Sequence, residues 1–205
     1  TSSSWNWESG FNNYHTVHQA EEIRDLNIRA IYSNWAFLKT KKYEQFKFYK
    51  LNELQFVTGK RESFRLMGDH ILTEEDVVNK VEYPDAVVTT NWGIDLHYPD
   101  PENSKRFPGT EFIAYAVHNS KEKDIYTFPY RCLYSRNISN LFMAGRNISV
   151  THIALGTVRV QRTTGMMGEV IGLAASLCKE RKCLPRDIYN YYLGDLFNLI
   201  DTGCL

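Results

Sequence analysis

Four small residues near the C-terminal end of the sequence have a spacing that suits the binding of a nucleotide cofactor. Gly165, Gly168, Gly172 and Ala175 lie on one narrow stripe if this stretch is helical. Glycine costs about 1 kcal/mol relative to alanine inside a helix, so three glycines on one face indicate that another group lies against the helix backbone. A strand that leads into such a helix is a common way to hold a nucleotide.

A turn upstream of this helix carries a second candidate group. The turn Ala144-Gly145-Arg146 ends an apolar stretch at residues 140–144 that is predicted to be a strand. The carboxyl ends of strands are where α/β proteins place their ligands. Gly145 permits close approach of the backbone, and Arg146 can bind a hydroxyl or a phosphate oxygen. Taken alone, the pattern indicates only a tight turn with a surface arginine.

Longer motifs give the sequence a resemblance to a known family. Residues 140–182 resemble the C-terminal flavin-binding segment of FAD-dependent oxidoreductases related to the glutathione reductase and fumarate reductase folds. The resemblance implies an α+β fold that is a fragment of an α/β FAD-binding fold. A β-rich substrate domain with helices is expected first, followed by the last strand and helix of a Rossmann-like FAD domain. It covers nearly the whole chain, through motifs at residues 5–11 (WNWESGF), 20–39, 59–77 (GKRESFRLMGDHILTEEDV), 93–97 (GIDLH) and 128–133 (FPYRCL).

The resemblance implies FAD as the cofactor and also implies which residues hold it. In flavoenzymes of this type, the amino end of the helix after Gln161 points at the pyrimidine edge of the isoalloxazine. Its free amides and positive end stabilise the charge that the reduced ring carries there. The implied cofactor-binding residues are Gly145, Arg146, Arg162, Thr163, Thr164, Gly165 and Met166.

Polar residues that flank this segment are the predicted catalytic residues. Thr151-His152 stands where relatives commonly carry a Ser/Thr-His pair, and an imidazole with an ordinary pKa near neutrality can bind substrate or move a proton. Arg131 and Arg159 lie in apolar contexts, which indicates a buried partner for each. A carboxylate of the substrate and a structural acid fit that pattern equally well.

Further residues match the family on the substrate side. His97 and Arg65 lie in family motifs and are the predicted substrate-binding residues, with a structural role as the alternative for each. Phe64 stands where relatives often have arginine, which weakens the case for a basic cluster. The two tryptophans and the glutamate of residues 5–8 (WNWE) are expected to line the pocket above the flavin, or else to form an ordinary aromatic pair.

The sequence departs from the family at one motif. Family members open with a strand, a G-x-G-x-x-G turn and a helix that bind the ADP half of FAD, and none of the 12 glycines here forms that pattern. We therefore expect the 205 residues to be the C-terminal portion of a larger protein, with its N-terminal FAD-binding portion as their main partner.

Composition restricts the class of protein further. A hydrophobic content of 43% with 14% aromatic residues indicates a globular chain. Lys plus Arg and Asp plus Glu number 24 each, so no overall field favours nucleic acid or an anionic membrane as a partner. No apolar run is long enough to cross a bilayer. The four cysteines form no C-x-x-C pair, so free thiols are expected, and no metal site is predicted.

The pattern of apolar residues predicts the elements that must position these groups. They divide into a substrate or cap domain at residues 1–133 and a C-terminal FAD-binding segment at residues 134–205. The predicted helices lie at 17–39, with a capping box at Thr16 and Gln19, after a cap at Thr73, at 161–182 and at 186–200. The region at 43–133 is predicted to be β-rich, with strands within 43–72 and at 85–97, 111–117 and 124–133, and a loop at 98–109. A last strand is predicted at 140–144.

The leading prediction of function is the transfer of a hydride between FAD and a small organic substrate. A lyase that acts on an acidic sugar is an alternative from another class, since tyrosine, histidine and arginine are abundant. A non-catalytic module that completes a flavin site on another chain is the third. The sequence contains no specific lyase motif.

Overall fold

The computed structural model describes residues 7–119 and 125–203, which divide into two compact units. The smaller unit joins residues up to 62 with residues 97–117, and the larger unit joins residues 63–96 with residues 118–205. The boundary predicted after residue 133 separates a substrate or cap domain from an FAD-binding segment. This functional division stays a prediction. The compact units cut the chain at other points, because residues 63–96 pack with the C-terminal third of the chain.

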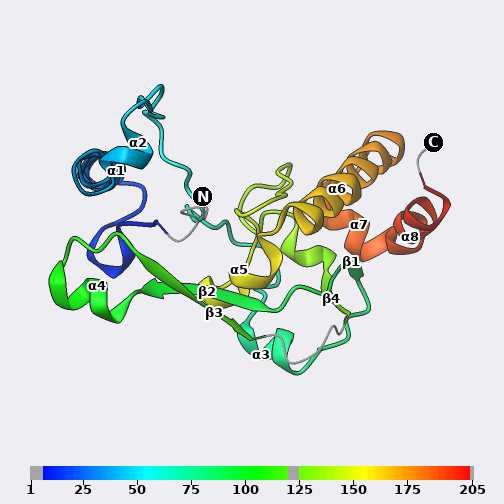
Figure 1. Ribbon diagram of the computed structural model, residues 1–205. Coiled ribbons are helices and arrows are strands. Elements are labelled where there is room, and N and C mark those ends of the chain that lie inside the picture. Colours follow the sequence, from blue (N-terminus) through cyan, green and yellow to red (C-terminus); the bar gives the residue numbers. More distant parts are fainter. Residues whose placement is uncertain (1–6, 120–124, 204–205) are drawn as a thin grey trace. The chain divides into compact units, whose positions relative to one another are not determined.

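The core of the larger unit lies between a two-stranded sheet and the longest helix of that unit. β1 (Ala86–Thr90) and β4 (Tyr126–Pro129) pair antiparallel, with Val88 opposite Phe128. Both of these side chains are fully buried. α6 (Gln161–Arg181) packs on β1 and on α7 (Pro185–Tyr191) and α8 (Leu193–Thr202) (Figure 1).

The predicted C-terminal helices are confirmed, with one break. α6 matches the helix expected at 161–182, and its apolar face is buried through Val170, Leu173 and Leu177. The helix expected at 186–200 is interrupted at Tyr192, whose backbone angles are not helical, so it forms α7 and α8 in its place. Among the described residues, no helix is long and apolar enough to cross a membrane.

The connection that leads into α6 differs from the prediction. The strand expected at residues 140–144 is wrong, since these residues form only a single antiparallel bridge, between Tyr134 and Phe142. Their backbone groups bond to a turn instead: the amide of Met143 donates to the carbonyl of Leu133 at 2.7 Å. No second strand lies alongside in the described part of the chain, so the buried side chain of Met143 belongs to an irregular segment.

A short helix that the sequence pattern did not reveal follows this segment. α5 (His152–Val158) begins after Thr151, whose hydroxyl accepts a hydrogen bond from the amide of Ala154 at 3.3 Å. The amide of Thr151 in turn donates to the carbonyl of Leu72 at 2.9 Å. α3 (Glu74–Val78) also lies in this unit, and the capping box predicted at Thr73 is confirmed, with Asp76 as its second member.

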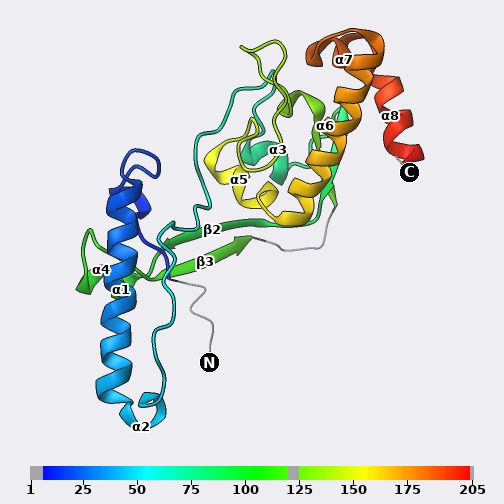
Figure 2. The same cartoon turned by 90° about the horizontal axis from the view of Figure 1, so that it is seen from above.

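The smaller unit is dominated by α1 (Ala20–Lys41), which confirms the helix expected at 17–39 (Figure 2). The capping box expected at Thr16 and Gln19 is wrong: the side chain of Gln19 accepts from the amide of His15 instead, and the helix has no side-chain cap. Ile23 is the one buried residue of α1. Most of the helix is therefore covered only in part by its own unit.

The strands expected within residues 43–72 are wrong. α2 (Tyr43–Phe46) opens this stretch and no strand follows it before residue 72. The alternating aromatic residues that suggested strands, such as Phe48 and Phe56, are exposed. Alternation produces a strand only where a neighbouring strand completes the hydrogen-bond ladder, and none of the described strands pairs with this stretch.

The remaining strands agree with the prediction. The β-rich stretch at 85–97 forms β1 and β2 (Ile94–Pro99), and the stretches at 111–117 and 124–133 form β3 (Ala114–Asn119) and β4. β2 pairs with β3. The loop expected at 98–109 contains α4 (Pro101–Arg106), because Asp100 caps it through the amide of Asn103 and Pro101 suits its first position. A 3-10 turn, η1 (Phe11–Asn13), precedes α1, and another, η2 (Tyr130–Cys132), follows β4.

Candidate functional site

The structure brings the predicted Gly-Arg turn next to the first turns of α6. The amide of Gly145 donates to the sulfur of Met167, 22 residues further along the chain, at 3.3 Å. Gly145 has a φ of 98°, a conformation that side chains other than glycine rarely adopt. Arg146 is exposed beside it. The turn and the helix thus form one continuous surface of the larger unit.

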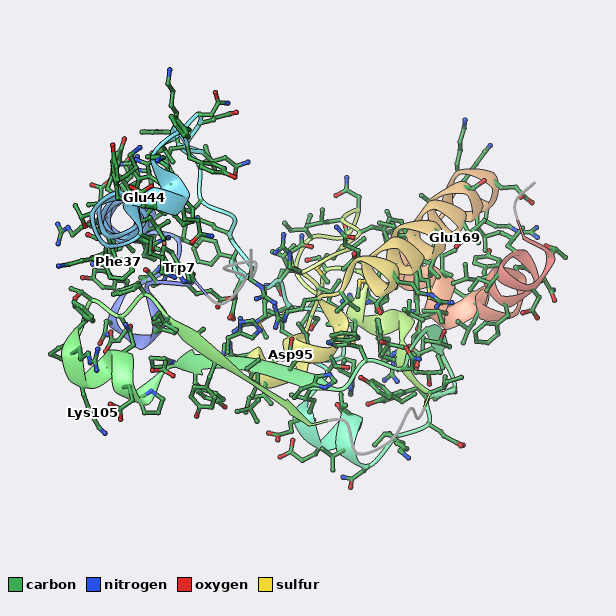
Figure 3. The ribbon with its side chains drawn as sticks, in the orientation of Figure 1. Trp7, Phe37, Glu44, Asp95, Lys105 and Glu169 are labelled. Carbon is green, nitrogen blue, oxygen red and sulfur yellow. The ribbon has the colours of Figure 1, made fainter. Side chains whose placement is uncertain are left out.

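The small-residue stripe of α6 forms an uncovered face of the helix. Gly165, Gly168, Gly172 and Ala175 are all exposed. A Cβ atom built on any of the three glycines would meet no atom within 4 Å outside the helix itself. Glu169, next to Gly168, also lies on α6 away from the core (Figure 3). Within the described residues, nothing in this chain accounts for glycine at these three positions.

The side chains of the first turn of α6 divide into two groups. Arg162 is exposed and the hydroxyl of Thr164 donates to the carbonyl of Gln161 at 3.0 Å. Thr163 is buried and donates to the hydroxyl of Thr90 on β1 at 3.1 Å, while Met166 is partly buried against the core. Arg162, Thr164 and Gly165 therefore border the open side of the helix, and Thr163 anchors the helix to the sheet.

Three predicted residues interact electrostatically around α5: His152 and Arg159 lie at its two ends, and Arg65 comes from a distant part of the sequence. His152 is the first residue of this helix, at the protein surface. Partial burial of the ring, and then the positive charges of Arg65 and Arg159, lower the pKa of His152 below its ordinary value. The imidazole is therefore neutral at neutral pH, and a neutral imidazole can accept a proton.

Arg159 is held by an acidic residue of β2. Its Nη2 donates to the backbone carbonyl of Asp95 at 2.9 Å and to the carboxylate of Asp95 at 3.1 Å. Gly156 makes this arrangement possible, because a Cβ atom there would lie 2.7 Å from the carbonyl oxygen of Asp95. The structural acid, one of the two partners left open for Arg159, is thus Asp95.

Arg131 has a structural acid as its partner as well. Its Nε and Nη2 each donate to a carboxylate oxygen of Asp85 at 2.9 Å, and its backbone amide donates to the same carboxylate at 3.1 Å. Asp85 is fully buried, and its hydrogen bonds with Arg131 raise the pKa of that guanidinium. The Arg131 guanidinium also lies 5.0 Å from the ring centroid of Tyr189. These contacts describe a residue that braces the core.

His97 belongs to the smaller unit and is paired there with a residue of the WNWE motif. Its Nδ1 lies 2.7 Å from the carboxylate of Glu8. Arg61 donates to the same carboxylate oxygen at 2.7 Å. Trp7 packs edge-on against Phe112, with ring centroids 6.1 Å apart. Trp5 lies outside the described residues.

The residues that sequence reasoning missed are the partners of the arginines. Asp85 and Asp95 stand beside apolar residues in the β-rich stretches, as Arg131 and Arg159 do in theirs. Acidic and basic residues that each interrupt an apolar run are a signal for buried pairs. The sequence did not indicate a role for Gly156, because glycine is required there only by the close approach of the β2 backbone.

Two further kinds of group, potential metal ligands and cysteines, occur in the described part of the chain. No group of three or more His, Cys, Asp or Glu residues there is arranged to hold a metal ion. Cys132, Cys178 and Cys183 are free thiols, as expected, and Cys204 lies outside the described residues. Burial raises the pKa of Cys178 to about 12, and the neighbouring Cys183 adds to that shift.

The comparison with known families gives a match over almost the entire chain. The model of the family described as FAD dependent oxidoreductase matches residues 2–196. No curated protein and no solved structure matches the chain. The match spans both compact units, including the Gly145 turn and the first turns of α6.

Proposed function

The chain belongs to the family of FAD-dependent oxidoreductases, and from that premise we propose that it takes part in hydride transfer between FAD and a small organic substrate. FAD is the cofactor of the family. The observation that carries the proposal is the open glycine face of α6 beside the Gly145 turn. Glycine at these three positions lowers the stability of the helix, and nothing in the described chain requires it there. A further group that lies against the helix backbone would explain the three glycines.

The residues present fit a flavin at this place. Gly165 offers an approach to bare backbone, and the exposed residues Arg162 on α6 and Arg146 in the neighbouring turn offer positive charge. The amino end of α6 provides free amides and about half a positive charge. A bound flavin would supply the redox chemistry, while these groups would orient it and favour negative charge near the helix end. Thr163 would act indirectly, by fixing α6 to β1.

We expect the ADP half of FAD to be held by residues other than these 205. The glycines here include no G-x-G-x-x-G turn, which binds a pyrophosphate in related folds. Under this proposal, the N-terminal FAD-binding portion of the protein lies against the open face of α6. Residues 134–205 would be the last piece of the FAD domain.

The group at the start of α5 is proposed to act on the substrate. His152, neutral at neutral pH, would accept a proton from the substrate, with Arg65 beside it to bind a polar group. Arg159 would position this group through Asp95, and Arg131 would act only by bracing the core. His97, paired with Glu8, stays a predicted substrate-binding residue of the smaller unit.

Replacing Gly165 with valine tests the cofactor site. The new side chain has free space in this chain, so the fold should be kept. A flavin or the segment that holds it would collide with the side chain, and the full-length protein should purify with at least about tenfold less flavin. The measurement is the visible absorption of the flavin per mole of protein.

Gly194→Val is the matched control for this test. Gly194 is an exposed helical glycine of α8, and a Cβ atom there also meets nothing within 4 Å. This variant should keep its flavin. Normal flavin content in Gly165→Val, with both variants folded by circular dichroism, would rule out the proposed position of the cofactor.

A further inference from the structure

A basic and aromatic segment projects at the end of α1 in the smaller unit. We call residues 39–51 the tip segment; it covers the last turn of α1, α2 and the residues that follow (Figure 2). Glu44 is its one acidic residue. Five lysines and one glutamate give the segment a net charge of +4, although the whole chain has a net charge of 0. The lysines are Lys39, Lys41, Lys42, Lys47 and Lys50.

Large apolar side chains alternate with these lysines on the surface. Phe48 is 88% exposed, Tyr49 is 62% exposed and Tyr43 is 55% exposed. Leu51 is also exposed. Single exposed apolar residues are ordinary on protein surfaces, but four within nine residues form a concentrated patch.

Hydrogen bonds hold the tip segment in a defined conformation. The Nζ of Lys39 donates to three backbone carbonyls, those of Phe46 at 3.2 Å, Lys47 at 3.1 Å and Tyr49 at 3.2 Å. The rings of Phe46 and Tyr49 pack with their centroids 5.6 Å apart. The exposed side chains of Phe48 and Tyr49 are therefore presented from an ordered backbone, which lowers the entropy that binding would cost.

Lys41, Lys42 and Lys50 supply positive charge around this ordered turn. All three are exposed. Lys47 is partly neutralised, since its Nζ lies 2.7 Å from the carboxylate of Glu44. A partner that matches this surface must offer dispersed negative charge and, just below it, an apolar layer.

We propose that the tip segment docks on an anionic phospholipid surface. Lysines reach the phosphate and carboxylate groups of such a surface, while aromatic and leucine side chains enter the boundary between headgroups and acyl chains. Nucleic acid fits less well, since base stacking uses ring faces along a positive groove, and the tip segment is a short turn at the end of a helix. The docking is peripheral and is independent of the redox function.

Vesicle binding by the purified full-length protein tests this proposal. The protein should sediment with vesicles of phosphatidylcholine and phosphatidylserine, and much less with vesicles of phosphatidylcholine alone. Higher salt should weaken the binding, because screening acts on exposed charges. Lys41→Ser with Lys42→Ser should lower the partition coefficient by about fivefold per lysine, hence roughly 25-fold. Phe48→Ser with Tyr49→Ser should lower it by about tenfold or more.

Matched changes elsewhere on the surface serve as controls. Lys105→Ser with Lys179→Ser removes the same charge from exposed sites outside the tip segment, and Tyr191→Ser removes an aromatic ring that is 75% exposed on α7. Both controls should bind vesicles like the wild type. No binding to the anionic vesicles, full binding by either tip variant, or tip-dependent binding of an oligonucleotide in place of vesicles would overturn the proposal.

Discussion

At the scale of single residues, the environment of His152 decides what its imidazole can do. The nearby charges of Arg65 and Arg159 add to burial and disfavour the protonated ring. Arg159 is compensated by Asp95, which lies within hydrogen-bond distance of it. Of the two arginines, Arg65 has the larger effect on the pKa of His152.

Replacing Arg65 with glutamine should raise the pKa of His152. Removal of a positive charge makes protonation of the ring easier, so the pKa should move up toward its ordinary value of about 6.5. NMR titration of the histidine ring protons measures the shift. Arg162→Gln, on the first turn of α6, should leave the titration unchanged, and a pKa that stays the same or falls in Arg65→Gln would contradict the proposed grouping.

At the scale of elements, α5 and β2 are fitted to each other through a glycine. Gly156 lies in the middle of α5, where its lack of a side chain lets the helix approach the backbone of Asp95. This contact holds Arg159 against Asp95 and fixes the direction of the helix that begins with His152. Packing of α5, rather than helix propensity, accounts for this glycine.

Gly156→Ala should destabilise the protein by about 1–3 kcal/mol, because the added methyl group lies too close to a backbone atom that cannot move freely. Gly194→Ala on α8 makes the same chemical change in open space and should leave stability unchanged or raise it by up to about 1 kcal/mol. Urea denaturation of both variants gives the comparison. Equal midpoints for the two would show that α5 does not depend on this close contact.

At the scale of the whole molecule, the chain consists of two units that carry different parts of the candidate chemistry. The larger unit contains the Gly145 turn, α6 and the His152 group, and the smaller unit contains His97 with Glu8. The proposed site on α6 contacts only the flavin part of FAD, since the pyrophosphate-binding turn of related folds has no counterpart in this sequence. Cofactor affinity therefore tests the whole arrangement.

Because we propose that residues other than these 205 hold the ADP half of FAD, the 205-residue chain by itself should bind FAD weakly, with a dissociation constant at least about a hundredfold higher than that of a protein that also contains those residues. The physical reason is that the helix end and glycine face contact only part of the cofactor. Fluorescence titration with FAD measures both constants. Tight binding by the isolated chain would mean that the site is complete within these residues.

The sequence by itself determined the elements whose signal is local. The α6 helix, its buried apolar face and its glycine stripe follow from a repeat of 3.6 residues, and the cap at Thr73 follows from four consecutive residues. The motifs that indicate FAD are likewise contiguous stretches of the chain. The family and its cofactor therefore follow from residue order alone, because a contiguous motif needs no distant partner to be recognised.

Only the tertiary structure decided what depends on a partner distant in the chain. Alternating aromatic residues at 43–72 did not form strands, because no described strand completes their hydrogen bonds, and residues 140–144 bond to a turn instead. Asp85 and Asp95 became the partners of Arg131 and Arg159, and Arg65 came to lie near His152, through packing between segments dozens of residues apart. Sequence periodicity records which face of an element is apolar, but it does not record which other element covers that face.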